Sequence, residues 1–409
     1  MSYRKIGDLI QLVDQRNKDL SITHLVGLTI NKKFIPSVAN TIGTDMTNYK
    51  LIRKNQFACS TMQVRRDKKM PIALLKELDI AIISQAYPVF EVIDENVILP
   101  DYLMLWFSRS EFDREACFHA VGGVRGSLEW EDFCGMQLPV PSIEEQRQIV
   151  AQYQSIAKKI KVNEQICEKL EATAQALYKH WFVGFEFPNE EGKPYKSSGG
   201  QMVWNEELGK EIPEGWEVGK IKDFAKIKNG YAFKSDWWEE KGLPVIKIGS
   251  IQNGYVQLKE LGFISDVHKL NNINKGDYGD IVIAMTGATI GKIGLIIGDF
   301  KEYLINQRVG LFNLINKYYK SYLYFSLCQD WFNYEIQNVG GDSAQANVSD
   351  KQILDISILK PNEEIIKNYH NYCKDVIKMI LIISSQNEKL TQLQSLLLSR
   401  LAVGEEVSA

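Results

Sequence analysis

Apolar side chains recur alternately every four and three positions along two long segments of this chain. The first series runs from Ile149 to Trp181 and the second from Tyr369 to Leu401. A period of 3.5 residues held over such a length predicts a coiled-coil seam. The apolar seam positions are Ile149, Tyr153, Ile156, Ile160, Leu170 and Leu177 in the first segment and Tyr369, Val376, Ile380, Ile383, Leu390 and Leu397 in the second.

Both segments begin with a helix-start signal. Ser142 and Glu145 form an S-x-x-E capping box, and Asn362 stands at the matching place before two glutamates. We therefore expect helices over 142–184 and 362–403. The alternative is that each helix packs only on its own globular domain. Length argues against it, because about 40 residues of helix extend roughly 60 Å.

Polar residues also occupy the seam, at Asn163, Asn387 and Gln394. They would weaken apolar packing but help to fix register and orientation. An antiparallel pairing is expected, because a globular region must connect the end of the first helix to the start of the second. Such a pairing makes the molecule pseudo-two-fold symmetric, as when two copies of one unit form an isologous contact.

The chain also repeats itself. Residues 168–186 and 388–406 agree at seven of nineteen positions, at a constant offset of 220. The same offset places Pro141 on Pro361, Glu144 on Glu364 and Phe112 on Phe332. This collinearity predicts a tandem duplication of a unit of about 220 residues, which is far longer than a solenoid repeat.

The regions before the two helices have a different texture. Short apolar runs separated by Gly, Asn, Asp and Pro predict strands and turns with some helix, which is an α+β fold. The expected organisation is a first globular domain (1–141), a long helix (142–184), a linker rich in Gly, Pro and charge (185–213), a second globular domain (214–361) and a second long helix (362–403).

Composition excludes several classes of protein. The six cysteines form no C-x-x-C pair and the five histidines do not cluster, so neither a zinc site nor a disulfide framework is expected. The first residues lack an apolar signal region. The longest apolar run, 376–383, is interrupted by Lys378 and is too short to span a bilayer. A cytoplasmic location is the expectation.

The charge of the chain limits the ways in which it could bind nucleic acid. The net charge is −3, and each globular domain contains as many acidic as basic residues. A non-specific binder held mainly by phosphate contacts is therefore disfavoured. Local basic clusters remain as DNA-binding candidates, with ordinary solvated surface as the alternative. They are Arg65, Arg66, Lys68 and Lys69 in the first domain, and Lys228 and Lys234 around Tyr231 in the second.

Three glycine-rich loops add candidates for base contacts. Arginine can bind guanine with two hydrogen bonds, and Gln or Asn can do so with adenine. The loop candidates are Arg125 and Ser127, then Thr289 and Lys292, then Ser343, Gln345 and Asn347. An ordinary mobile loop is the alternative in each case. Gln85 and Gln307, at similar places in the two copies, are interpreted as structural hydrogen-bonders rather than base readers.

Catalytic motifs were sought and not found. The segment Gly287–Lys292 resembles a P-loop but has one residue too few between its glycines, and Ile293 stands where Ser or Thr should hold magnesium. The chain shows no methyltransferase motif for cofactor or catalysis, and no hydrolase motif. The sequence therefore predicts a chain that is not an enzyme.

Three stretches resemble one known family: LPVPSIEEQRQIV (138–150), FEFPNEEGKPYKSSGGQMVWNEELGKEIPEGWE (185–217) and MTGATIGKIG (285–294). With the order of domains and helices, they resemble the specificity subunit of type I restriction-modification systems. The first domain departs from the pattern, since it starts at Tyr3 without the Pro-Glu-Gly-Trp lead-in of the second.

The resemblance implies a role for each part. Each globular domain would be a target recognition domain that reads one half of a bipartite site in double-stranded DNA. The helices, as central and C-terminal conserved regions, would set the spacer and dock two methyltransferase subunits, which two restriction/translocase subunits can join. S-adenosylmethionine, ATP and magnesium would belong to those partners, and this chain would bind no cofactor. A coiled-coil adaptor with two protein-binding heads is the alternative, slightly favoured by the neutral domains.

Overall fold

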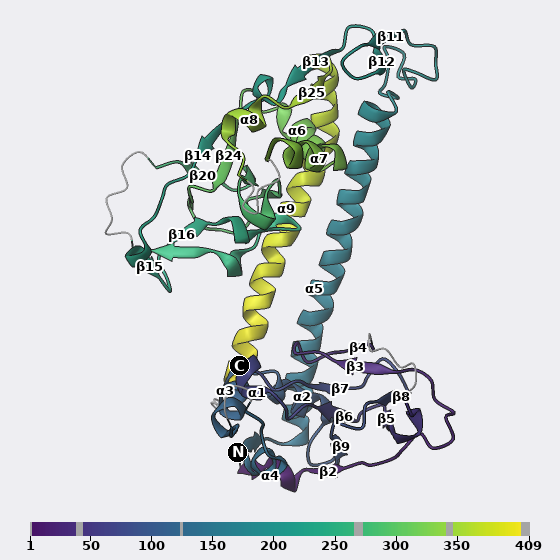
Figure 1. Ribbon diagram of the computed structural model, residues 1–409, viewed down its shortest axis with the longest axis vertical. Coiled ribbons are helices and arrows are strands. Elements are labelled where there is room, and N and C mark those ends of the chain that lie inside the picture. The colour runs from purple at the N-terminus through teal and green to yellow at the C-terminus, as the bar shows by residue number, and fades with distance from the viewer. Residues whose placement is uncertain (1, 38–43, 123–125, 266–272, 341–346, 402–409) are drawn as a thin grey trace. The chain divides into compact units, whose positions relative to one another are not determined.

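The computed structural model describes residues 2–37, 44–122, 126–265, 273–340 and 347–401 (Figure 1). The chain divides into two compact units. Unit 1 comprises residues 1–159 and 390–409, and unit 2 comprises residues 160–389. Both divisions fall inside the two long helices.

Unit 1 contains short strands and short helices around a phenylalanine-rich core. Its strands are β1 (Ser2–Lys5), β2 (Ile10–Leu12), β3 (Val26–Leu28), β4 (Phe34–Pro36), β5 (Lys50–Arg53), β6 (Phe57–Cys59), β7 (Ile72–Leu74), β8 (Ile80–Ile83), β9 (Val89–Val92) and β10 (Gln137–Val140). Its short helices are α1 (Val64–Asp67), α2 (Pro100–Phe107), α3 (Ser110–His119) and α4 (Trp130–Gly135).

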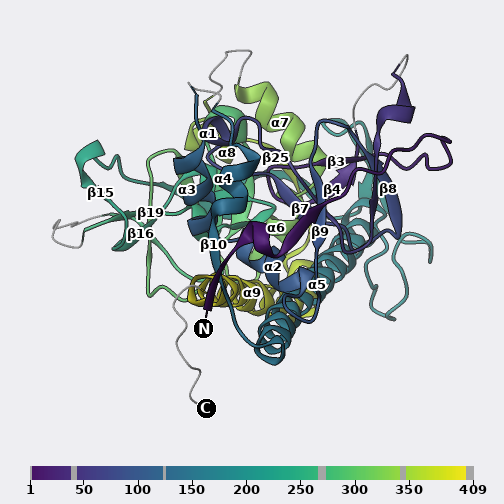
Figure 2. The same cartoon turned by 90° about the horizontal axis from the view of Figure 1, so that it is seen from below.

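The main sheet of unit 1 has the order β2-β9-β6-β7 and is antiparallel throughout. The separate pairs β1-β10, β3-β4 and β5-β8 complete the strands. α2 packs against β7 (Figure 2). Phe57 and Phe90 stack with ring centroids 5.0 Å apart, and Phe107 meets both edge-on. These aromatic contacts join the sheet to α2.

One ion pair ties the β3–β4 hairpin to the helices of unit 1. The ammonium of Lys32 lies 2.8 Å from a carboxylate oxygen of Asp113 on α3, and both side chains are nearly buried. Lys32 also donates to the Phe107 carbonyl, and the same oxygen of Asp113 accepts the backbone N–H of Met70 at 3.1 Å. Burial lowers the pKa of Lys32 below its ordinary value, and the carboxylate of Asp113 opposes this shift.

Unit 2 repeats this plan and has additional strands. All of its strands are β11 (Met202–Asn205), β12 (Lys210–Pro213), β13 (Glu217–Lys220), β14 (Ala225–Asn229), β15 (Trp238–Glu239), β16 (Leu243–Ile246), β17 (Ile251–Gln252), β18 (Gly254–Val256), β19 (Gly262–Ile264), β20 (Lys275–Gly276), β21 (Ile281–Ala284), β22 (Ile293–Leu295), β23 (Tyr303–Ile305), β24 (Val309–Leu314) and β25 (Ser357–Lys360). The short helices are α6 (Tyr319–Leu327), α7 (Asp330–Gly340) and α8 (Asp350–Leu354).

The duplication is visible in the topology of the sheets. The order β14-β24-β21-β22 in unit 2 matches β2-β9-β6-β7 in unit 1, and the pair β13-β25 matches β1-β10. In each unit three short helices follow the sheet strands and precede the last strand. Unit 2 extends its main sheet by β18 and β17 and adds a second sheet, β15-β19-β16-β23-β20. The predicted α+β tandem duplication is therefore confirmed.

The two predicted long helices are α5 (Ile143–Tyr178) and α9 (Glu363–Arg400). The capping box is present, since the N–H of Glu145 donates to the Ser142 hydroxyl and the Ser142 N–H donates back to the Glu145 carboxylate. After Tyr178 the helix widens into a π turn over Lys179–Val183. The expected helix over 142–184 thus ends in a turn of different hydrogen bonding.

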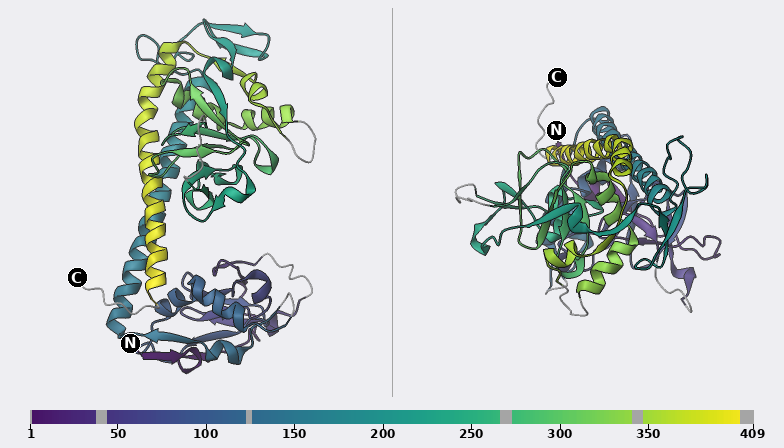
Figure 3. Two further views of the ribbon diagram at one scale, coloured as in Figure 1. Left: turned by 90° about the vertical axis from the view of Figure 1, so that its left-hand side faces the viewer. Right: turned by 90° about the horizontal axis from the view of Figure 1, so that it is seen from above.

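Within unit 2 the helices run side by side in opposite directions (Figures 1 and 3). Asn163 bonds Asn387 at 2.8 Å, and the hydroxyl of Tyr369 donates to the carbonyl of Ala174 at 3.2 Å. As residue numbers rise on α5 they fall on α9, so the pairing is antiparallel. In unit 1, Val150 of α5 and Leu401 share the hydrophobic core. All twelve predicted apolar seam positions are buried or half-buried, and their assignment to one coiled-coil seam stays a prediction.

The asparagine pair gives a prediction about the seam. Asn163 is 1% exposed, and its amide nitrogen donates to the Asn387 side chain. Replacing Asn163 alone with leucine should destabilise unit 2 by about 1–3 kcal/mol, because the half-buried side-chain oxygen of Asn387 then loses the amide donor of Asn163. Replacing both asparagines with leucine should restore most of that stability. Urea unfolding of the three proteins would measure this, and equal stability of single and double variants would contradict it.

The segment 185–213, expected as a linker, has fixed contacts in the structure. Phe185, Phe187 and Ile212 are buried in the core of unit 2, and β11 pairs with β12. Phe187 stacks between Tyr195 and Trp216, with ring centroids 4.6 and 4.9 Å away. Composition described this segment by its Gly, Pro and charge, whereas the aromatic residues between them decide its packing.

Candidate nucleic-acid interface

Four connecting segments of unit 2 meet at one edge of the main sheet. Backbone hydrogen bonds join them in series: Gln307 N–H to Tyr231 at 2.9 Å, Met285 N–H to Arg308 at 3.0 Å, and Val348 N–H to Met285 at 3.0 Å. The segments are 229–234, 306–308, 285–292 and 347–348, and we call them together the loop surface of unit 2. They lie at matching ends of β14, β24 and β21 because these strands are paired in register.

Glycine permits the closest of these approaches. A Cβ atom on Gly230 would lie 2.2 Å from the carbonyl oxygens of Ile305 and Asn306, closer than any side chain tolerates. Tyr231 forms a parallel β-bridge with Asn306, and its N–H donates to the Ile305 carbonyl at 2.8 Å. The backbone of the loop surface is thus held by contacts from several strands.

Aromatic and basic side chains cover one part of this surface. Tyr231 is 41% exposed and stacks almost parallel with Trp237, with centroids 6.1 Å apart. The ammonium of Lys234 lies 5.6 Å from the Trp237 ring centre. A cation held over an aromatic face keeps its charge available to an anion while its stem is supported. Two of the sequence candidates, Tyr231 and Lys234, are therefore brought together.

Other candidates lie on the same surface. Lys292 and Asn347 are exposed, and Asn347 forms a backbone bridge with Thr286. The hydroxyl of Thr289 donates within its own turn to the carbonyl of Thr286 at 3.4 Å. Ser343 and Gln345 lie outside the described residues.

Lys228 is placed differently from the other candidates. It lies on β14, and its charge acts on Asp280 at the beginning of β21. Burial raises the pKa of Asp280, and the nearby cations Lys320 and Lys228 oppose that shift. Of these influences on Asp280 that of Lys228 is the smallest, and the Lys228 side chain is exposed.

Sequence reasoning missed two residues of the loop surface. Gln307 and Arg308 form the turn between β23 and β24, and both side chains are exposed. Within the described part of the chain neither side chain makes a hydrogen bond or ion pair. Gln85 is likewise exposed and without a side-chain hydrogen bond to the described residues. The described residues thus offer no partner that would make Gln85 and Gln307 structural hydrogen-bonders.

Unit 1 has an equivalent surface between β6 and β7. The N–H of Leu128 donates to Thr61 at 2.9 Å, as that of Val348 does to Met285. Ser127 and Asn347, which are 220 positions apart, thus occupy equivalent places. α1, which carries the basic cluster, corresponds to the turn Gly287–Thr289. The separation between α1 and Gly287–Thr289 differs from 220 because the two repeats differ in length upstream of these segments. A comparison of the sequence at one constant offset therefore did not pair them.

The basic cluster of unit 1 divides into held and unpaired cations. The Arg65 guanidinium donates to the Gly122 carbonyl at 3.1 Å and so supports the 121–127 loop. Arg66 binds Asp67 through two hydrogen bonds of 2.6 and 3.1 Å. Lys68 and Lys69 are exposed, and described side chains form no ion pair with them. Arg125 lies outside the described residues.

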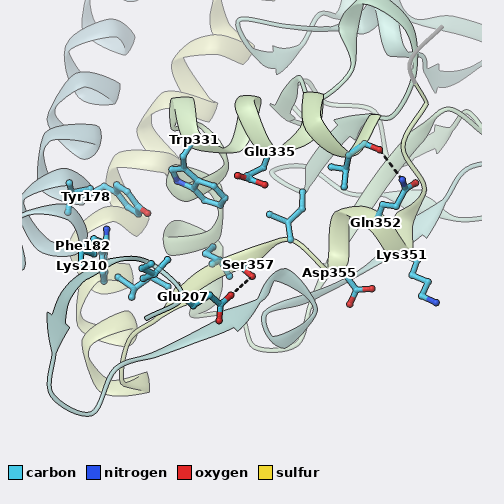
Figure 4. Close-up of a pocket in the computed structure, with 16 residues that line it drawn as sticks. Tyr178, Phe182, Glu207, Lys210, Trp331, Glu335, Lys351, Gln352, Asp355 and Ser357 are labelled. Carbon is cyan, nitrogen blue, oxygen red and sulfur yellow. Dashed lines mark hydrogen bonds between the residues drawn. The ribbon is translucent and has the colours of Figure 1, made fainter. Parts of the chain in front are cut away.

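A hollow of about 840 Å³ lies elsewhere in unit 2, among the β11–β12 hairpin, α7, α8 and β25 (Figure 4). Trp331 and Glu335 line it from α7. Two hydrogen bonds join groups of its lining: Ser357 donates to Glu207 at 2.8 Å and Gln352 to the Val339 carbonyl at 3.0 Å. None of the candidate DNA-binding residues lines it, and we assign it no function.

Among the described residues, no helix combines the length and apolar character needed to cross a bilayer. Three or more His, Cys, Asp or Glu side chains do not gather anywhere in these ranges in a way that could hold a metal ion.

The chain matches the family model described as the type I restriction modification DNA specificity domain, over residues 2–172 and again over 213–392. It belongs to this family, and the two matches correspond to the two repeats. The chain is a type I restriction-modification specificity subunit, which has a DNA-recognition role and not a catalytic one. The adaptor alternative is not favoured.

Individual relatives agree with this assignment. The type I restriction enzyme MjaIX specificity subunit of Methanocaldococcus jannaschii is 24% identical, over 77% of this chain and 71% of its own length. The HindI specificity subunit of Haemophilus influenzae is 22% identical over 98% of both chains. The fold is similar to that of a type I restriction-modification S subunit from M. genitalium, with a TM-score of 0.58, 15% identity and coverage of 99% and 96%.

Proposed function

We propose that this chain directs a type I restriction-modification complex to a bipartite sequence in double-stranded DNA. Each globular domain reads one half of the site through its loop surface. α5 and α9 set the spacer between the halves and dock two methyltransferase subunits, and restriction/translocase subunits join where the system cleaves. The complex acts in the cytoplasm.

One observation carries this proposal. The two repeats present equivalent loops between equivalent strands, yet with unlike side chains. Arg65 and the lysines after it stand in unit 1 where Gly287, Ala288 and Thr289 stand in unit 2. A shared scaffold with different side chains is what two unlike half-sites require, because phosphate contacts position a protein and base contacts specify the sequence.

The division of chemistry follows from the residues present. S-adenosylmethionine, ATP and magnesium belong in this proposal to the partner subunits. The described part of this chain offers DNA-binding groups with little excess charge, so partner subunits supply much of the phosphate contact. The stoichiometry of two methyltransferases to one specificity chain rests on the repeat, which provides two equivalent helices.

Methylation mapping tests the proposal. The chain is expressed with its methyltransferase in a host that lacks modification, and the genome is sequenced by a method that detects modified adenine. The expected result is one bipartite motif with a fixed spacer that disappears when the specificity gene is removed. An unmodified genome in cells where the complex has formed would contradict it. Native mass spectrometry of the complex checks the two-to-one ratio.

A further inference from the structure

The turn between β23 and β24 combines a backbone held by hydrogen bonds with two exposed side chains. The N–H of Asn306 donates to Ile246 at 3.1 Å, that of Gln307 to Tyr231 at 2.9 Å, and the Arg308 carbonyl accepts from Met285 at 3.0 Å. The turn also closes on itself, since Val309 N–H donates to the Asn306 carbonyl at 2.9 Å. Backbone bonds to three other segments leave this turn little freedom.

The side chains of Gln307 and Arg308 contrast with that backbone. Both are exposed, and neither bonds another group in the described ranges. A fixed Cα position reduces the conformational entropy that the side chain loses when it binds a ligand. Rigid support beneath free polar groups is the arrangement that specific recognition needs.

The chemistry of the pair suits base edges. Arginine offers a planar fork of donors that matches O6 and N7 of guanine, and glutamine can accept from and donate to adenine in the same two-bond manner. The neighbouring cations Lys234 and Lys292 lie on the same loop surface. They are suited to the phosphates on either side of a contacted base.

The other repeat provides an internal comparison. Its connection from β8 to β9 carries Gln85 where unit 2 has Gln307, and Ala86 where unit 2 has Arg308. Gln85 is also exposed and unpaired among the described residues. The same turn therefore presents glutamine in both repeats and arginine in one, which would produce unlike half-sites.

We propose that Gln307 and Arg308 read base edges in the half-site bound by the second globular domain, with Arg308 contacting a guanine. Gln85 has the corresponding role in the first domain. This inference rests on the proposed function and adds which turn of each domain determines the bases.

The experiment compares methylation motifs among variants of the full complex. Arg308→Ala should lower the preference for G·C over other base pairs at least fivefold at one position in one half of the methylated motif. The other half and the spacer should remain unchanged. Gln307→Ala should relax a neighbouring position. Gln85→Ala should change only the opposite half. Lys301→Ala, an exposed cation elsewhere in the second domain, is the control and should leave the motif unchanged.

Arg308→Lys separates base reading from simple phosphate contact. If Arg308 uses its two-donor fork, lysine should not restore discrimination at the relaxed position. Uniformly weaker methylation of an unchanged motif in Arg308→Ala, restored by lysine, would overturn the proposal in favour of a phosphate contact. For a variant that methylates weakly, competition binding with oligonucleotides substituted at each position measures the same ratios, and unchanged penalties throughout would also overturn it.

Different results would contradict the proposed function and the proposed role of Gln307 and Arg308. If the unaltered complex yields no bipartite motif, the proposed function is contradicted. If it yields one and the Arg308 and Gln307 variants keep every position, only the present inference is wrong.

Discussion

Replacing Asp113 with alanine is expected to destabilise unit 1 by about 3–5 kcal/mol, because it leaves the buried ammonium of Lys32 without its counter-charge. The two groups lie 2.8 Å apart, with side-chain exposures of 9% and 11%. The substitution also removes the acceptor of the Met70 N–H. Urea unfolding of the full chain would measure the change, and a loss below about 1 kcal/mol would contradict the prediction.

A double variant provides the matched control for Asp113. Lys32→Met with Asp113→Asn removes both charges and keeps an oxygen for the Met70 N–H. It should recover most of the stability that Asp113→Ala loses, because a neutral pair of similar size avoids a lone buried charge. A double variant as unstable as the single one would show that packing, and not charge, dominates at this position.

The pH dependence of Asp113→Asn follows from the shifted lysine. Burial already holds the pKa of Lys32 below 10.5, and loss of the carboxylate lowers it further. Between the folded and unfolded pKa values the unfolded chain binds more protons, so stability rises with pH in that window. The deficit of Asp113→Asn should therefore be smaller near pH 9 than near pH 7.

Tyr369→Ala should destabilise unit 2 by about 3–5 kcal/mol, since it empties a fully buried aromatic position on α9. The ring lies 5.0 Å from Phe182 and 5.7 Å from Trp181, and it also meets Phe325 of α6. Removing it breaks the contact between the two long helices and the second globular domain. Urea unfolding followed by tryptophan fluorescence would measure the change.

Two controls define the origin of that loss. Tyr369→Phe removes only the hydroxyl that donates to the Ala174 carbonyl, and about 1 kcal/mol is expected. Tyr372, one turn along α9 and 64% exposed, should tolerate alanine with less than about 1 kcal/mol. Comparable losses at Tyr369 and Tyr372 would contradict the assignment of Tyr369 to the core.

Some residues of the loop surface could be predicted from the sequence and others could not. Tyr231, Lys234, Lys292 and Asn347 were found because basic, aromatic and amide residues in turn-prone segments are recognisable in the sequence. Arg308 was missed because it lies between two apolar strands, in a turn with no glycine or basic cluster. Its exposure depends on the contacts of the turn with Tyr231 and Met285, which are distant in sequence.

Sequence by itself determined the long helices and the duplication, because apolar spacing and a constant offset are local or periodic properties of the chain. It also determined the family, through motifs that lie close together in sequence. Tertiary structure alone decided that α1 and the turn at 287–289 are equivalent, that residues 185–213 pack into a core, and that the exposed side chain of Gln307 bonds no other described residue. These features depend on strand register and on contacts between residues that are distant in sequence. No local sequence pattern predicts such contacts, and insertions obscure the correspondence between the two repeats.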